Sequence, residues 1–295
     1  MINEYKEKWK QGLVKGEYDD CRFCEDKVKF AKDWLLSNMP SLNLEEPQNI
    51  VDRIAKLKIE DIENPDIAYI RLKSRWSDKV GVYDELASMG MTELQLPYEW
   101  RGYRKTFDET ILDKLDERPS DWHYIIKCNH GSGYNLMYTP KQTKHEIVVE
   151  NMNRWLNTNY AYISGLELQY KWIKPGYVVQ PVYVQQPLDW SFWCEYGEIE
   201  GVGLTRKCGK NYEQYIAFVD EWGNQNKWYI GAEPDQVDLF PSQKAILERM
   251  KPYVKALVRP FKFVRCDMYC INNVIYFGEL TFSPCSGVLE ITNRS

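Results

Sequence analysis

The sequence predicts a protein of the α+β class, because helical and strand-like patterns occupy different parts of the chain. Apolar side chains recur at three- and four-residue spacing over residues 20–36 and 47–62, as they do in amphipathic helices. Three later stretches contain two β-rich runs around a turn signal, which is typical of antiparallel hairpins. These hairpins are expected at 122–138, 189–205 and 265–281. A chain of 295 residues can hold two or three subdomains and bury a sizeable core.

Composition narrows the class of partner. Lys and Arg total 38 against 43 Asp and Glu, so the chain has a formal net charge of -5 and no basic field for nucleic acid. The 21 Tyr and 11 Trp are compatible with binding of flat ligands such as sugars. The chain begins with charged residues and has no apolar run that could cross a bilayer, so we expect a cytoplasmic protein. Eight scattered Cys favour reduced structural thiols over a zinc site.

The elements between the hairpins follow from local patterns. In residues 76–90, Ser77 or Asp78 is placed to cap a short helix with Lys79 in its first turn. A lysine is disfavoured there by the helix dipole, so a ligand contact and a plain exposed side chain are both open. Basic residues at 205–211 form either a solvated turn or a loop that carries charge into a site. The remaining elements are strands at 92–96 and 177–184, and helices at 108–115, 141–157 and 242–257.

The first hairpin carries a glycine-rich turn that suits phosphate. Lys127 ends an apolar strand, and the following turn contains Gly131, Ser132 and Gly133. Backbone N–H groups in such a turn are unobstructed by side chains and can contact phosphate oxygens, and Lys127 points towards the same place. The same three residues also make an ordinary hairpin connector. The turn alone therefore leaves both interpretations open.

The last hairpin brings charges together only in one strand register. Successive strand residues point to opposite faces, so Arg265 and Asp267 share one face of the first strand, and Glu279 and Thr281 share one face of the second. A two-residue turn at Asn272-Asn273 would separate Asp267 from Glu279, whereas a three-residue loop with a bulge would gather all four side chains. Two carboxylates beside an arginine form a site for a hard cation and phosphate. The alternative is a solvated strand face.

Five motifs in this order resemble the ATP-grasp superfamily, and within it the TupA-like branch, over residues 50–289. They are Ser77-Asp78-Lys79, Lys127-Cys-Asn-His-Gly-Ser-Gly133, Lys174-Pro175, Val264-Arg-Cys-Asp-Met-Tyr269 and Phe277-Gly-Glu-Leu-Thr-Phe-Ser-Pro-Cys-Ser-Gly287. The resemblance implies the ATP-grasp fold, in which two α+β lobes, here 76–184 and 185–295, hold ATP between them after a mostly helical segment at 1–75. Enzymes of this superfamily phosphorylate a carboxylate, and a nucleophile such as an amine then attacks the acyl phosphate.

The resemblance also implies roles for individual residues. Those that bind ATP would be Lys79, Lys127, Asn129, His130, Gly131, Ser132, Gly133, Gln180, Val182 and Val184. Mg²⁺ would be held by Asp267, Glu279 and Thr281, the last at a position where the superfamily often has Asn. Arg265 and Arg206 would be catalytic, and Ser286 and Gly287 would bind substrate. Lysines, a glycine-rich cover and metal carboxylates are the parts that phosphoryl transfer requires.

Two departures from the family pattern bear on catalysis. The hinge commonly has an acidic residue where Gln180 or Pro181 stands, and the next strand usually has lysine in place of Ser191. Gln180 can still accept from the adenine amino group, and Arg206 or Lys207 can replace the missing lysine. The leading hypothesis is an ATP- and Mg²⁺-dependent carboxylate-amine ligase that joins an amino acid or similar small molecule to a sugar-linked acceptor, a glycan or cell-surface polymer precursor. The alternatives are a degenerate nucleotide-binding member and a carbohydrate-binding module.

Overall fold

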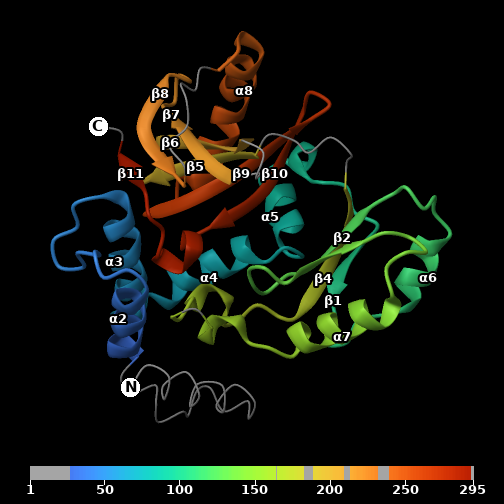
Figure 1. Cartoon of the computed structure of the whole chain (residues 1–295). Coiled ribbons are helices and arrows are strands. Elements are labelled where there is room, and N and C mark those ends of the chain that lie inside the picture. The colour runs from blue at the N-terminus through green and yellow to red at the C-terminus, as the bar shows by residue number, and fades with distance from the viewer. Residues whose placement is uncertain (1–26, 164, 183–188, 209–212, 232–238, 294–295) are drawn as a thin grey trace. The chain divides into compact units, whose positions relative to one another are not determined.

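The computed structural model describes residues 27–163, 165–182, 189–208, 213–231 and 239–293 (Figure 1). The chain divides into two compact units. Unit 1 comprises residues 1–37 and 59–184, and unit 2 comprises residues 38–58 and 185–295. Each unit combines helices with an antiparallel sheet, which confirms the predicted α+β class.

Unit 1 is built on a four-stranded sheet with the strand order β1-β4-β2-β3. Its strands are β1 (Trp100–Tyr103), β2 (Tyr124–Cys128), β3 (Asn135–Tyr138) and β4 (Gly176–Pro181). Its longer helices are α2 (Lys27–Asn38), α4 (Ile67–Ser77), α5 (Val82–Ser88), α6 (Thr110–Asp116) and α7 (His145–Leu156). Helix α3 (Ile50–Glu63) belongs to unit 2 up to residue 58 and to unit 1 from residue 59. Short 3-10 helices lie at Thr92–Leu94, Tyr160–Tyr162 and Leu168–Tyr170.

The core of unit 1 follows from the alternation of side chains along β2. Tyr124, Ile126 and Cys128 are buried in one hydrophobic cluster with apolar side chains of α6 and α7. Lys127 lies between them in sequence and therefore points to the opposite face of the sheet. The alternation thus separates a packed face from a face that carries polar side chains.

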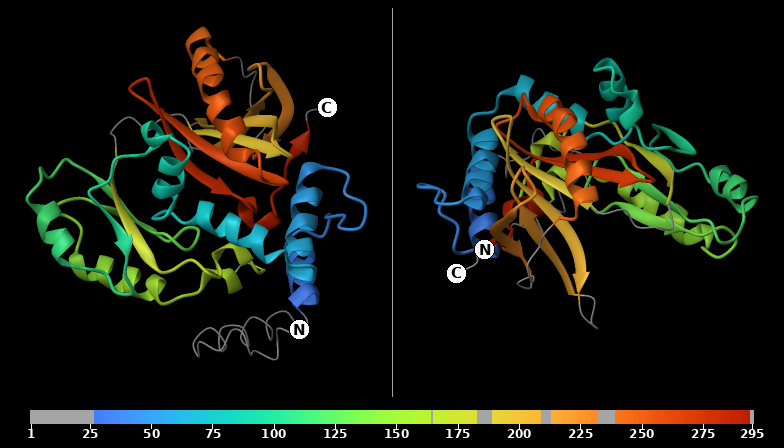
Figure 2. Two further views of the ribbon diagram at one scale, coloured as in Figure 1. Left: turned by 180° about the vertical axis from the view of Figure 1, so that it is seen from behind. Right: turned by 90° about the horizontal axis from the view of Figure 1, so that it is seen from above.

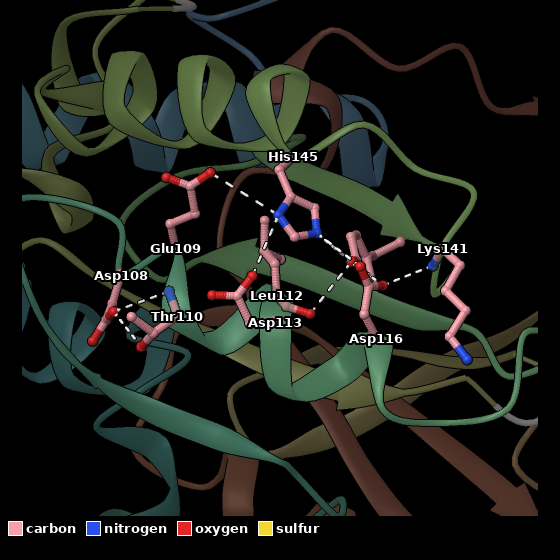
Figure 3. Close-up of polar contacts among 9 residues, drawn as sticks. Asp108, Glu109, Thr110, Leu112, Asp113, Asp116, Lys141 and His145 are labelled. Atoms are coloured by element: carbon pink, nitrogen blue, oxygen red, sulfur yellow. Dashed lines mark hydrogen bonds and ion pairs between the residues drawn. The ribbon is translucent and has the colours of Figure 1, made fainter.

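A polar cluster joins α6, the end of β3 and the start of α7 (Figure 3). His145 Nε2 lies 3.1 Å from Asp116 Oδ2, and its Nδ1 lies 3.9 Å from Asp113 Oδ1. The other oxygen of Asp116 accepts hydrogen bonds from the Tyr138 hydroxyl at 2.6 Å and the Lys141 backbone at 2.7 Å. Burial acts to raise the pKa of Asp116, but these hydrogen bonds outweigh it and hold the pKa below its ordinary value. The cluster fixes the packing of α6 against the sheet.

Unit 2 is built on a seven-stranded antiparallel sheet with the order β10-β9-β5-β6-β7-β8-β11. Its strands are β5 (Asp189–Glu195), β6 (Glu198–Cys208), β7 (Glu213–Val219), β8 (Gln225–Ile230), β9 (Phe263–Ile271), β10 (Val274–Thr281) and β11 (Thr292–Asn293). Helix α8 (Pro241–Val258) lies against the sheet (Figure 2). Its residues Leu247, Met250, Val254 and Val258 are fully buried at helical spacing, which explains why the sequence predicts this helix well.

Several predicted elements differ in the structure. The strand expected at 92–96 is a 3-10 helix at Thr92–Leu94, and strand β1 was not predicted. The helix expected at 141–157 begins only at His145. The basic segment at 205–211 is not a loop in its first half, since Arg206 and Lys207 pair with residues of β7 within β6. Residues 209–211 lie outside the described part of the chain.

Among the helices that the structure describes, none is long and apolar enough to cross a membrane.

Candidate functional site

The β9–β10 hairpin reaches the predicted arrangement by a different route. Its turn has two residues, Asn272 and Asn273, both left-handed with φ of 51° and 64°, so of the two turn lengths considered the shorter one is present. The ladder runs regularly until Phe277 pairs with Met268, and then shifts so that Glu279 pairs with Asp267. The odd register shift that the shared face requires is therefore a bulge at Gly278 and not a longer turn. Directly paired residues share a face, so the two carboxylates lie side by side.

Gly278 is required at the bulge by close backbone approach. A Cβ atom there would lie 2.8 Å from the Asp267 carbonyl oxygen and 2.8 Å from Cε2 of Tyr269. A backbone carbonyl inside a ladder cannot move aside as a flexible side chain can. The absence of a side chain at this position thus allows the register shift that aligns Glu279 with Asp267.

Four side chains converge on this face of β9 and β10. Arg265 Nε donates to Asp267 Oδ1 at 2.8 Å, and its Nη2 also bonds the other Asp267 oxygen. The same Nη2 reaches Glu279 Oε1 at 3.3 Å and Thr281 Oγ1 at 3.2 Å, and Thr281 donates to Glu279 at 3.0 Å. Arg265, Asp267, Glu279 and Thr281 are therefore brought together on one face, which was one of the two alternatives that the sequence allowed.

Burial and like charge perturb this cluster. Burial raises the pKa of Asp267 to about 6, and Glu279 adds to the rise, while Arg265 opposes it. Burial acts to lower the pKa of Arg265, but Asp267 and Glu279 outweigh it and raise that pKa. The site thus holds two carboxylates whose mutual repulsion a further cation would relieve.

The donor set fits Mg²⁺ that arrives with a phosphate ligand. Within the described ranges, no group of three or more His, Cys, Asp or Glu side chains is arranged to hold a metal. Enzymes usually bind Mg²⁺ through one or two carboxylates, with substrate phosphates and water completing the octahedron. Asp267 and Glu279 supply two carboxylates and Thr281 a hydroxyl, which matches that pattern.

A strained turn follows β10. Cys285, Ser286 and Gly287 have consecutive left-handed φ values of 47°, 58° and 86°. The turn begins at Pro284, three residues after Thr281, so it directly follows the strand that carries Glu279 and Thr281. Left-handed non-glycine residues persist only where their surroundings hold them, and they are concentrated at functional sites.

In unit 1, Asn129 connects three of the motifs on which the resemblance rests. Its Nδ2 donates to Asp78 Oδ1 at 2.7 Å and to the Lys174 carbonyl at 2.9 Å, and Asn129 is fully buried. Lys79 Nζ donates to the Gly131 carbonyl at 3.0 Å. The three motifs that contain Asp78, Asn129 and Lys174 thus meet at one buried amide.

Asp78 does not cap a helix N-terminus as expected. It follows the end of α4, and its backbone N–H bonds the Ser74 carbonyl, while α5 begins four residues later with Gly81 before it. Lys79 therefore lies in the connection between two helices and is not opposed by a helix dipole. Asp78 instead accepts from Asn129 and, at 2.7 Å, from the Tyr103 hydroxyl.

The glycine-rich turn is held by packing as well as by hydrogen bonds. His130 Nε2 lies 3.0 Å from the Trp155 carbonyl and 3.2 Å from that of Thr158, and burial lowers the pKa of this histidine. A Cβ atom on Gly131 would lie 2.9 Å from the Tyr160 ring. His130 and Gly131 are thus buried inside unit 1, whereas Ser132 and Gly133 are exposed and half of the turn remains accessible.

Lys127 and Gln180 share the polar face of the four-stranded sheet. Lys127 pairs with Val178 of β4, and Gln180 lies two residues further along that strand. Gln180 Nε2 donates at 2.9 Å to the Tyr83 hydroxyl, which donates its own hydrogen to the Leu96 carbonyl at 3.1 Å. This contact uses the amide nitrogen of Gln180 and does not involve its side-chain oxygen, which is the atom that would accept from adenine. Val182 N donates to the His123 carbonyl at 2.8 Å.

Two other predicted positions are placed only in part. Val184 lies outside the described residues. Arg206 is placed as a backbone position within β6, and its side chain is not among those described.

Comparison with known families decides the assignment. The family model described as TupA-like ATPgrasp matches residues 71–295. The chain belongs to the TupA-like ATP-grasp family. Membership confirms the resemblance and the predicted ATP-grasp fold class.

Solved structures give weaker likenesses. The chain is 13% identical to D-alanine–D-alanine ligase from Bacillus anthracis, with a TM-score of 0.48, over 86% of this chain and 82% of that one. The chain is 15% identical to the ATP complex of the ligase from the same organism, with a TM-score of 0.42, over 70% of this chain and 55% of that one. It is 12% identical to phosphoribosylamine–glycine ligase from Thermotoga maritima, with a TM-score of 0.38, over 71% of this chain and 48% of that one. The chain thus spans about half the length of two of these structures. No curated protein matches. The assignment rests on the family model.

Ser191, which stands where the family usually has lysine, lies beside the carboxylate cluster. Ser191 of β5 pairs with Asp267 of β9, and its side chain acts to lower the pKa of that carboxyl against the larger effect of burial. A lysine there would stand beside the two carboxylates, so its replacement leaves Arg265 as the cation in direct contact with Asp267 among the described side chains. Sequence reasoning missed Tyr83, which holds Gln180, and Lys58, which is 228 residues from the carbonyl it contacts. Neither residue carries a local signal of its role.

Proposed function

We propose that the protein is an ATP- and Mg²⁺-dependent ligase that joins a carboxylate to an amine through an acyl phosphate. The observation that supports it most is the alignment of Asp267 with Glu279 by the bulge at Gly278, beside Arg265, in a chain of the ATP-grasp family. Carboxylates for a metal with an adjacent guanidinium are what transfer of a phosphoryl group requires. Bound Mg²⁺ would neutralise charge on the phosphates.

Each unit has its own part in this proposal. In unit 1, the residues proposed to bind ATP are Lys79, Lys127, Asn129, His130, Gly131, Ser132, Gly133, Gln180, Val182 and Val184. In unit 2, Asp267, Glu279 and Thr281 bind the metal, and Arg265 stabilises the acyl phosphate. Ser286 and Gly287 bind an anionic group of the substrate, for which the support is that their left-handed turn directly follows β10, the strand that carries Glu279 and Thr281.

The substrates are proposed from the family alone. We infer that a small carboxylate such as an amino acid is joined to an amine on a sugar-linked acceptor, a precursor of a glycan or cell-surface polymer. A cytoplasmic location fits ATP as a substrate, and it fits Cys128, Cys194, Cys266, Cys270 and Cys285, which are free thiols.

ADP release tests the proposal. Purified protein with ATP and Mg²⁺ is screened against mixed amino acids and sugar acids, each with and without amines. Release that depends on both a carboxylate and an amine supports the ligase. The Lys127→Ala variant should lose turnover and keep its Tm, because a partly exposed lysine contributes little to folding and much to a desolvated phosphate. Lys114→Ala, an exposed lysine on α6, is the control. Unfolding of Lys127→Ala would show that the lysine is structural.

The loss of lysine at Ser191 favours one second candidate, a degenerate member that binds nucleotide without turnover. In the ligase proposal, Arg206 or Lys207 supplies the missing cation. A missing cation costs on the order of 2–4 kcal/mol of transition-state stabilisation in a closed site. Arg206→Ala and Lys207→Ala should therefore lower kcat more than they raise the KM for ATP. Full activity in both variants would remove this role, and ATP binding without ADP release from any pair would favour the degenerate member. Sugar binding without ATP binding would favour a carbohydrate module.

A further inference from the structure

Helix α3 brings a buried lysine into unit 2 from outside the family match. Lys58 precedes the matched region, which begins at residue 71, and only 5% of its surface is exposed. Its Nζ donates to the Ser286 carbonyl at 2.8 Å. Burial of an ammonium group is unfavourable unless it is paired or hydrogen-bonded. Lys58 is therefore placed for a contact, and the contact is with the strained turn.

The segment before Lys58 is itself fixed within unit 2. Asn49 caps α3, its Oδ1 accepting from the Val51 backbone at 2.8 Å and the Asp52 backbone at 3.0 Å. One turn later, Arg53 forms a two-pronged contact with Glu195 of β5, with Nη2 at 2.7 Å and Nε at 2.8 Å. Glu195 is buried, so this pair anchors α3 to the sheet.

The turn that Lys58 contacts needs support. Cys285 and Ser286 are both left-handed without being glycine, which is unfavourable for L-amino acids. Within the turn, Ser286 N donates to the Ser283 carbonyl at 2.8 Å and Val288 N to the Cys285 carbonyl at 3.1 Å. The ammonium of Lys58 adds a charge-assisted hydrogen bond to the Ser286 carbonyl, and this bond stabilises the same turn conformation.

Lys58 also sets the direction of a backbone donor. The Ser286 carbonyl and the Gly287 N–H belong to one planar trans peptide, and the two groups point in opposite directions. Because Lys58 draws the carbonyl towards α3, the Gly287 N–H points away from α3. A cation on the carbonyl side polarises the peptide and strengthens its N–H as a donor.

We propose that Lys58 is a positioning residue that holds the 284–287 turn and aims the Gly287 N–H at an anionic oxygen of the substrate. This deepens the proposed function and rests on it, since there Ser286 and Gly287 contact substrate. It also makes residues 38–58 part of the ligase site, although they precede the family match. Lys58 acts through the turn and does not itself contact substrate.

Hydrogen exchange of the full chain tests the contact without turnover. In Lys58→Met, the Ser286 and Val288 amides should exchange about tenfold faster or more, the factor expected when a charge-assisted hydrogen bond is lost. Lys56→Met is the matched control, because Lys56 is on the same helix and donates at 3.1 Å to the Glu45 carbonyl in an exposed setting. Lys58→Arg, which keeps a charged donor, should restore slow exchange and serves if the Met variant does not fold.

Kinetics then separate positioning from a merely structural role. Lys58→Met should raise the KM for the carboxylate or amine substrate about tenfold and leave the KM for ATP within about twofold, with rescue by Lys58→Arg. Unchanged exchange in folded Lys58→Met overturns the proposal, and so does equal loss towards ATP and the other substrates. If the wild-type protein turns over no substrate pair, the proposed function fails, and exchange alone decides whether Lys58 holds the turn.

Discussion

Substitution of Gly278 by Ala tests the device that aligns the two carboxylates. The added Cβ would meet the Asp267 carbonyl oxygen at 2.8 Å and the Asp267 carbonyl carbon at 3.2 Å. Overpacking of this kind costs about 1–3 kcal/mol, from which about 0.4–1 kcal/mol is recovered because Ala restricts the unfolded chain. The net loss is then centred near about 1 kcal/mol and is at most about 2.6 kcal/mol, so Tm should fall by about 2–10 °C. Displacement of β10 also moves Glu279, and a shift on the order of 1 Å costs on the order of 100-fold in rate.

Gly201→Ala is the matched control for this measurement. Gly201 lies in β6 of the same sheet, and a Cβ there would meet neighbours at 3.4 to 3.6 Å, which is ordinary contact. Thermal unfolding and Mg²⁺-dependent ADP release are compared for both variants. If Gly278→Ala is as stable and as active as Gly201→Ala, the bulge does not depend on glycine and the explanation of the register is wrong.

Three further predictions follow from the contacts. Asp116→Asn should lower the free energy of unfolding at neutral pH, and the difference from the wild-type protein should shrink as pH falls below about 4. The reason is that the pKa of Asp116 is lower in the folded than in the unfolded protein, so its stabilising effect is present above the unfolded pKa and is lost as the carboxylate becomes protonated. A difference in urea unfolding that does not change with pH would contradict this prediction. Tyr83→Phe should cost about 1–2 kcal/mol and weaken ATP binding through Gln180, whereas Tyr196→Phe, at a 73% exposed residue, should change neither. Calorimetry should detect tight Mg²⁺ binding only with ATP, and tight binding without nucleotide would refute a site with two carboxylates.

Strong local patterns made much of the fold predictable. The buried stripe of α8 and the alternation along β2 are both readable from spacing, because each element packs one face against a core. The expectation that Arg265, Asp267, Glu279 and Thr281 share a face needed only strand alternation and some odd shift in register. Features of the site that depend only on strand alternation and on the order of residues could thus be predicted from the sequence.

The position of that shift was not accessible. The choice between a longer turn and a bulge is decided at Gly278 by the Asp267 carbonyl and the Tyr269 ring, which approach it across the hairpin. The Asn272-Asn273 pair adopts a two-residue left-handed turn that suits the twist of a hairpin. The two-residue turn and the bulge together give the alignment. Only the turn can be predicted from neighbouring residues, because the bulge depends on contacts across the hairpin.

Contacts between distant residues explain the other misses. Asp78 looked like a helix cap because its partner Asn129 is 51 residues away and a cap is what an aspartate after serine predicts locally. Strand β1 is only four residues long and contains glycine, so its pattern is weak. It becomes a strand through its pairing with β4 and the stacking of Trp100 on Tyr177 at 4.0 Å.

Oxygen transfer tests the central claim of acyl-phosphate chemistry most directly. The carboxylate that supports ADP release is labelled with ¹⁸O and turned over with ATP, Mg²⁺ and the amine, and the released phosphate is analysed by mass spectrometry. A carboxylate oxygen that attacks the γ-phosphorus leaves with phosphate when the amine displaces it, so the account predicts one ¹⁸O atom in each phosphate. Unlabelled phosphate formed together with the amide would contradict the acyl phosphate.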